Sequence, residues 1–93
     1  SPSTLIQTRV GEEYFKLFYF YETDVFEMYN ITKDISEKRN ILNNPTSKEM
    51  EIALQMNADM LTYLKTNDAP TGTWVKNGKK VPYPKVEGVT KYQ

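Results

Sequence analysis

Residues 14–21 read YFKLFYFY, and this stretch decides the fold. Its aromatic residues favour an extended strand. Because successive side chains of a strand point to opposite faces, Phe15, Leu17, Tyr19 and Tyr21 share one face. The other face consists of Tyr14, Lys16, Phe18 and Phe20. Both faces are largely apolar, so the strand must be covered on two sides, or on one side here and on the other by a body outside this sequence.

Two further strands are predicted beside it. Residues 4–10 form a short β-prone piece, which ends at a turn over Gly11, Glu12 and Glu13. Glu22 and Thr23 turn the chain again, into residues 24–30, where Phe26 and Met28 alternate with more polar positions. The first third of the chain therefore predicts a meander of antiparallel strands.

One long helix follows, from Thr46 to Thr66. Thr46 and Glu49 have the spacing of a capping box, in which the Thr oxygen and the Glu carboxylate each accept a free backbone N–H. Three-and-four spacing then predicts one buried stripe, flanked by a second set of apolar residues. The stripe is Met50, Ala53, Leu54, Asn57, Leu61 and Leu64, and the flanking residues are Ile52, Met56, Met60 and Tyr63.

The fold class is therefore predicted as α+β: a small antiparallel sheet of three to four strands packed against one long C-terminal helix, followed by an irregular tail. We expect a subdomain over residues 1–68 and a basic tail over residues 69–93, with a hairpin at 74–81. The Asn77-Gly78 pair is the preferred turn for such a hairpin and would place Lys76 opposite Lys79 and Trp74 opposite Val81.

Composition limits the possible functions. The 93 residues suffice for one domain with a thin core, and the 12 Lys and Arg balance 12 Asp and Glu. A basic excess typical of nucleic-acid binding is absent, so no nucleic-acid partner is expected. The longest unbroken apolar run is far too short for a membrane span, and no membrane partner is expected. The beginning of the chain resembles a cut through a longer protein, which we expect it to be.

The residues for catalysis are mostly missing. Without Cys or His there is no thiolate, no imidazole base and no ordinary zinc site. Four carboxylates lie within fourteen positions, at Asp24, Glu27, Asp34 and Glu37, but their spacing matches no calcium loop. Two interpretations remain open: a catalytic or metal-binding cluster, or turn-forming and solvated side chains, and the second is favoured.

The order of residues 16–42 adds a family resemblance. Lys16-Leu17, then residues 26–31 (FEMYNI), Asp34, Glu37 and residues 40–42 (NIL) follow one another as in a known pattern. This pattern resembles the C-terminal subdomain of bacterial sulfatases of the arylsulfatase type, in which "YKLI", "ELYNL" and "D-P-x-E-x-x-N-L" precede a long helix. It covers residues 4–68 and departs at Ile35, where the family usually has Pro. In this interpretation Asp34, Glu37 and Asn40 tie a polar turn that aims the chain at the helix.

The resemblance implies a non-catalytic part of a sulfuric ester hydrolase. Calcium and a formylglycine made in a "C/S-x-P-x-R" motif are expected in the missing catalytic domain, since this sequence lacks that motif. The upstream catalytic domain is the expected partner, docked on the second apolar face of residues 14–21, and the location is expected to be periplasmic or secreted.

The resemblance also implies that the subdomain can lie near the mouth of the substrate pocket, where a sulfated substrate such as a glycan would bind. The candidate substrate-binding residues are Trp74, Lys76, Lys79 and Lys80, because ammonium groups attract sulfate and an indole covers a sugar face. A merely solvated basic tail is the simpler alternative for them. No catalytic and no metal-binding residue is assigned.

A second function class also fits the sequence, a free-standing binding module for acidic glycans or a protein partner. It predicts a monomer with a covered core and salt-sensitive binding through the tail lysines.

Overall fold

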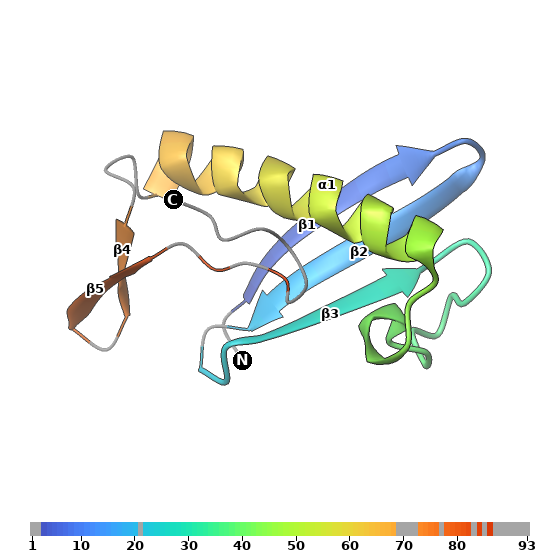
Figure 1. The fold of residues 1–93 in the computed structure, drawn as a ribbon, viewed down its shortest axis with the longest axis horizontal. Helices are drawn as coiled ribbons and strands as arrows, with labels where there is room; N and C mark the ends of the chain where they lie inside the picture. The colour runs from blue at the N-terminus through green and yellow to red at the C-terminus, as the bar shows by residue number, and fades with distance from the viewer. Residues whose placement is uncertain are drawn as a thin grey trace.

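The computed structural model describes residues 3–20, 22–68, 73–76, 78–82, 84 and 86. Three antiparallel strands, β1 (Ser3–Val10), β2 (Glu13–Phe20) and β3 (Val25–Asn30), form a sheet in the order β1-β2-β3. The helix α1 (Ser47–Tyr63) runs across one face of this sheet (Figure 1). The predicted α+β meander with one long helix is therefore confirmed. Tyr21, predicted to end the second strand, lies outside the described residues.

The β1–β2 hairpin is closed by a two-residue turn. Val10 pairs with Glu13 across it, and Gly11 at its first position has φ +64°. Only glycine adopts this conformation without cost, and a positive φ there is what a type II′ turn requires. The turn thus sets the register of all eight β1–β2 pairs, from Val10 with Glu13 to Ser3 with Phe20.

The predicted capping box starts the helix. Glu49 N–H donates to Thr46 Oγ1 at 3.0 Å, and Thr46 N–H donates to Glu49 Oε1 at 2.9 Å. A cap of this kind stabilises a helix by about 1 kcal/mol. At the other end α1 continues into a five-residue π-helical turn, η2 (Leu64–Asp68). The helical conformation thus reaches past Thr66, where it was predicted to end.

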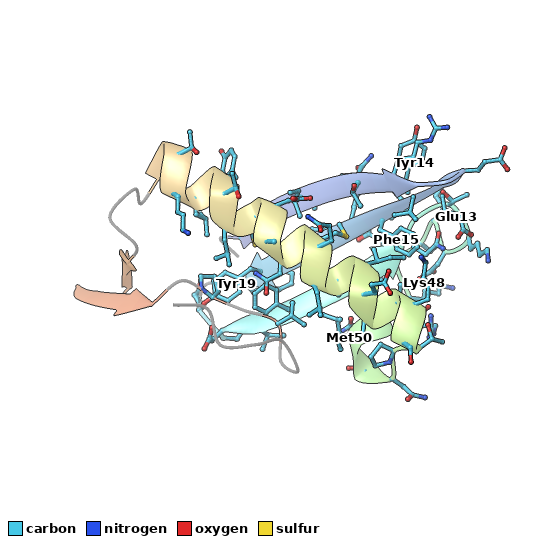
Figure 2. All side chains as sticks on the ribbon, turned by 45° about the horizontal axis from the view of Figure 1, so that its top comes forward. Glu13, Tyr14, Phe15, Tyr19, Lys48 and Met50 are labelled. Atoms are coloured by element: carbon cyan, nitrogen blue, oxygen red, sulfur yellow. The ribbon has the colours of Figure 1, made fainter. Side chains whose placement is uncertain are left out.

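The core lies between α1 and one face of the sheet, here called the inner face. Phe15 and Tyr19, labelled in Figure 2, and Leu17 between them are buried there from β2. From the rest of the chain the core takes Met28, Ile41, Ala53, Met56, Met60, Leu61, Leu64 and Val86.

Four of the six residues of the predicted stripe of α1 are buried, Ala53, Asn57, Leu61 and Leu64, but the buried face is shifted toward the predicted flanking residues on one side. Met56 and Met60, predicted as flanking residues, are fully buried, whereas Leu54 is only half-buried and Tyr63 is exposed. Met56 and Met60 belong to the same buried cluster as Phe15, Leu17 and Tyr19 of β2, where flexible thioether side chains suit an irregular space. Periodicity identified the helix but not its rotation about its own axis.

A second, separate sheet follows the helix. β4 (Thr73–Lys76) and β5 (Lys79–Pro82) pair antiparallel, with Trp74 opposite Val81 and Lys76 opposite Lys79 as predicted. In Figure 1 this hairpin lies beyond the C-terminal end of α1, away from the three-stranded sheet. Gly78 in its turn has φ +76°, and Asn77 lies outside the described residues. The predicted boundary between residues 68 and 69 remains a prediction.

After the hairpin the chain returns to the helix. Asn57 of α1 is only 2% exposed, and its amide donates to the carbonyl of Pro84 at 3.4 Å and accepts the backbone N–H of Val86. Val86 is itself buried in the core. A polar side chain in the middle of the apolar stripe thus holds the returning segment.

We predict that Asn57→Ala lowers the free energy of unfolding by about 1–3 kcal/mol, because the backbone groups of Pro84 and Val86 lose their buried partner. Urea unfolding at neutral pH measures the loss. The matched control is Gln55→Ala on the same helix, whose exposed amide bonds Asp59 at 3.1 Å, and which we expect to change stability by less than about 0.5 kcal/mol. Equal losses in the two variants would contradict the buried role of Asn57.

Candidate functional site

The connector, residues 31–46 between β3 and α1, is held by three polar side chains that accept backbone hydrogen bonds. Asn30, Asp34 and Asn40 each accept two backbone N–H groups that regular secondary structure would otherwise satisfy. Thr32 and Lys33 donate to Asn30, Lys38 and Arg39 donate to Asp34, and Met28 and Leu42 donate to Asn40, all at 2.9–3.1 Å. The expectation that Asp34 and Asn40 tie a polar turn is confirmed.

Glu37, within the connector, links it to the sheet by an ion pair. It has φ +53°, a conformation that few side chains adopt, and its carboxylate pairs with Lys16 of β2 at 3.1 Å. The short helix η1 (Ile41–Asn43) follows and places Ile41 in the core. Ile35, at the position where the sulfatase pattern usually has Pro, is 85% exposed. Proline at position 35 would face solvent, so its replacement by Ile leaves the turn intact.

Each of the four clustered carboxylates has a partner of its own within the chain. Asp24 accepts the hydroxyl of Tyr19 at 2.6 Å, and Glu27 accepts that of Tyr29 at 2.5 Å. Asp34 caps the connector, and Glu37 pairs with Lys16. Among the described residues, no group of three or more His, Cys, Asp or Glu is placed to hold a metal ion. The contacts support the interpretation of these carboxylates as structural.

These contacts change proton affinities. The backbone N–H groups of Arg39 and Lys38 lower the pKa of Asp34, because they stabilise its charged form. Arg39, at 3.2 Å, and then the backbone of Thr46 lower the pKa of Glu49. The hydrogen bond to Glu27 raises the pKa of Tyr29 to about 12, so this phenol remains protonated at neutral pH.

A cleft of about 480 Å³ opens where the connector meets the start of α1. Its three cations each have a carboxylate partner: Lys33 pairs with Glu13 at 3.0 Å, Arg39 with Glu49 at 3.2 Å and Lys48 with Glu51 at 3.8 Å. Because these cations already have carboxylate partners, the cleft offers little attraction for an anionic ligand.

The face of the sheet turned away from α1, here called the outer face, combines apolar residues with the polar Gln7, Arg9, Lys16 and Glu27, and no helix of the described residues covers it. It carries Leu5, Tyr14 and Val25, which are 49%, 41% and 43% exposed, and the half-buried Phe18 and Phe20. The rings of Phe18 and Phe20 stack at 5.7 Å between centroids. Adjacent exposed apolar groups of this kind are typical of an interaction surface.

The predicted substrate-binding residues are placed only by their backbone. Trp74 and Lys76 lie on β4, and Lys79 and Lys80 on β5. The register places Lys76 directly opposite Lys79, so the hairpin brings two of the three lysines together. Their side chains lie outside what the structure describes, and substrate binding by these residues remains a prediction.

Sequence reasoning missed two features of this surface. The first is the closing of the β3 edge by Asn40, which requires knowing that the connector folds back beside Met28. The second is the Lys16–Glu37 ion pair, which joins residues 21 positions apart on the outer side of the sheet. Lys16 as the lone charge in YFKLFYFY was a signal that a partner exists, though not which one.

The fold defines a small α+β domain in which, among the described residues, a helix covers one face of the sheet and none covers the other. The chain is similar to a sulfatase from Formosa agariphila, at 44% identity over an alignment 93 residues long that covers 98% of this chain. It spans only 17% of the length of that relative. The resemblance to a sulfatase, predicted from the order of residues 16–42, is therefore confirmed.

No protein-family model and no solved structure matches the chain. Within the part of the chain that the structure describes, no helix has the length and apolar character needed to cross a membrane.

We predict that acid destabilises the domain partly through Asp34. Its pKa is lower in the folded than in the unfolded state, so its contribution is present above the unfolded value of about 4 and is lost as pH falls through the folded value. Asp34→Asn should therefore be less stable than the parent at pH 7 and show a smaller loss on acidification. Urea unfolding at pH 7, 5 and 3 measures this.

The control for Asp34 is Glu12→Gln, which removes one carboxylate from the exposed β1–β2 turn. We expect it to keep the pH dependence of the parent. An Asp34→Asn variant that loses as much stability in acid as the parent would refute the assignment.

Proposed function

We propose that the chain is the non-catalytic C-terminal subdomain of a sulfatase of the arylsulfatase type, a sulfuric ester hydrolase, and that it braces the catalytic domain. The outer face carries this proposal. Leu5, Tyr14 and Val25 remain 41–49% exposed although they border the aromatic side chains of β2, and α1 covers only the inner face. The sulfatase relative, of which the chain spans 17%, has ample further chain to cover the outer face.

The chemistry in this proposal belongs to the rest of the polypeptide. Formylglycine needs a Cys or Ser in a "C/S-x-P-x-R" motif, and this sequence has none. The residues also do not fit a calcium site, because Asp24, Glu27, Asp34 and Glu37 each engage a separate protein partner. We therefore assign calcium and formylglycine to the catalytic domain, and a periplasmic or secreted location to the whole protein by analogy with sulfatases.

The β4–β5 hairpin is the proposed contribution to the mouth of the substrate pocket. Lys76 and Lys79 face each other across it, and Lys80 follows directly. Lysines at directly opposite positions of a hairpin repel one another, which supports an anionic partner, such as a sulfated glycan, for Lys76 and Lys79. Trp74, on the same hairpin, would supply a flat apolar surface for a sugar ring.

The same hairpin supports the second candidate function, a free-standing binding module for acidic glycans or a protein partner. In that case the outer face would remain exposed to solvent, and the lysines alone would bind the ligand. The two candidates differ in whether the outer face is buried in the full polypeptide.

We predict that Leu5→Lys and Val25→Lys weaken the full polypeptide but not the isolated 93-residue chain. A lysine on the outer face would lose about 2 kcal/mol of apolar burial per site at a docked interface, and almost nothing where the face is already wet. Thermal unfolding and hydrolysis of an aryl sulfate by the full polypeptide measure the effect.

The matched control is Ile35→Lys, which places the same charge at an exposed apolar residue of the connector. We expect it to leave both proteins unchanged. If Leu5→Lys and Val25→Lys behave like Ile35→Lys in the full polypeptide, the outer face is not docked and the bracing role is wrong.

We predict that Lys76→Gln, Lys79→Gln and Lys80→Gln together weaken binding of heparin, a sulfated polysaccharide, by about tenfold or more, and that added salt weakens binding to the parent. Trp74 is the single tryptophan, so its fluorescence reports binding at the hairpin. A triple variant of equal net charge, Lys33→Gln with Lys38→Gln and Lys48→Gln, is the control. Equal losses of heparin affinity in the two triple variants would show that net charge alone explains the effect, and would refute a binding site on the hairpin.

A further inference from the structure

The hairpin formed by β4 and β5 is attached to the domain at both of its ends. Before it, the chain leaves the helical segment at Asp68, shortly before β4 begins at Thr73. After it, the chain reaches Pro84, just beyond the end of β5 at Pro82. Among the described residues, β4 and β5 pair with each other and form a sheet separate from β1-β2-β3. The two attachments therefore decide how the hairpin is held on the domain.

The attachment after the hairpin combines a polar and an apolar contact. The amide of Asn57 donates to the carbonyl of Pro84 at 3.4 Å, and its Oδ1 accepts the backbone N–H of Val86. Asn57 is 2% exposed, and Val86, 4% exposed, belongs to the core cluster. The carboxamide thus meets the backbone with one donor and one acceptor, as a neighbouring strand would. Because its two ends are not interchangeable, the pair of bonds fixes both the position and the direction of the segment.

The place of Asn57 on the helix is a second observation. It lies in the buried stripe of α1 together with Ala53 and Leu61, where the spacing calls for an apolar residue. A leucine there would pack in the stripe without a polar group to satisfy. Burying a carboxamide costs free energy unless it is hydrogen-bonded, and a single buried Asn between packed helices sets their register at a cost in stability. The residue type thus favours a role in placing the returning segment.

The hairpin needs such placement. A two-stranded hairpin by itself is marginally stable in water. Its register places Lys76 directly opposite Lys79, and like charges at such positions repel each other. A segment tied at one end also samples more orientations than one tied at both ends. Holding the chain at Pro84 and Val86 therefore reduces the entropy that is lost when the lysines engage a ligand.

We propose that Asn57 is a positioning residue for the anion-binding hairpin and acts on it through Pro84 and Val86. This inference rests on the proposed function, which assigns the hairpin lysines to a sulfated ligand. It adds that the affinity of the hairpin depends on a residue buried in the core, outside the hairpin itself. The lysines supply the charge, and the bonds of Asn57 supply the fixed backbone that presents it.

The variant Asn57→Leu in the 93-residue chain tests this role. It removes both bonds and keeps the stripe of α1 apolar, so the core is retained. Binding of heparin, followed by the fluorescence of Trp74, should weaken about tenfold because the hairpin is no longer preorganised. The slope of log Kd against log salt concentration should stay that of the parent, since the same ammonium groups still displace counterions from the polyanion. The triple variant of Lys76, Lys79 and Lys80 to Gln should instead reduce this slope.

A second readout concerns the protein without ligand. Trp74 is the single tryptophan and lies on β4, so its time-resolved fluorescence anisotropy reports motion of the hairpin. At a temperature well below unfolding, Asn57→Leu should increase the amplitude of the fast anisotropy decay. An unchanged amplitude would mean that Asn57 only stabilises the fold, and would overturn the proposal.

Two further variants separate positioning from stability. Val86→Ser weakens the same attachment while α1 and the three-stranded sheet keep every residue, and it should weaken heparin binding as Asn57→Leu does. Ile41→Val trims a core residue of η1, at the opposite end of α1 from the hairpin (Figure 1), and should bind heparin like the parent. Parent-like binding by Val86→Ser, or equal losses in Ile41→Val and Asn57→Leu, would also overturn the proposal.

The outcomes distinguish this role from the proposed function. If the triple lysine variant loses heparin affinity and Asn57→Leu does not, the hairpin site stands and the positioning role is refuted. If the triple lysine variant binds like the parent, the hairpin site itself is wrong, and Asn57 has no binding site to position.

Discussion

One helix can cover only one face of a sheet, and this limit governs the structure. β2 is apolar on both faces, and α1 buries Phe15, Leu17 and Tyr19 on the inner one. The stacked rings of Phe18 and Phe20 remain on the other, beside the exposed Leu5 and Val25. Among the described residues no second helix covers that face, which agrees with the small share of surface that a small domain buries. The outer face is the direct consequence.

The connector shows how a polar segment can be rigid without regular structure. Asn30, Asp34 and Asn40 each satisfy two backbone N–H groups, so the turn needs neither a metal nor a disulfide. Asn40 has a double role, because it bonds Leu42 at the start of η1 and Met28 on the edge of β3. The residues that resemble the sulfatase pattern most closely are thus those that connect the sheet to the helix.

Some surfaces of the domain are covered by its own residues and others are not. α1 covers the inner face, and Asn40 bonds the β3 edge, whereas within the described part of the chain no helix covers the outer face. The hairpin β4–β5 and its lysines lie beyond the far end of the helix (Figure 1), and Asn57 holds the chain that returns from it. A sulfatase subdomain that docks on a catalytic domain would need both a covered face, which forms its own core, and an exposed face for the interface.

The sequence by itself determined the strands, the helix with its Thr46–Glu49 cap, the β4–β5 register and the sulfatase resemblance, because turns, caps and periodicity act between residues close in the chain. It also determined that β2 is apolar on both faces. The tertiary structure alone decided the shift of the buried face of α1 toward Met56 and Met60, the bonds of Asn57 to Pro84 and Val86, and the bond of Asn40 to the β3 edge. These depend on how separate elements pack against each other, and no local pattern encodes the angle at which a helix crosses a sheet.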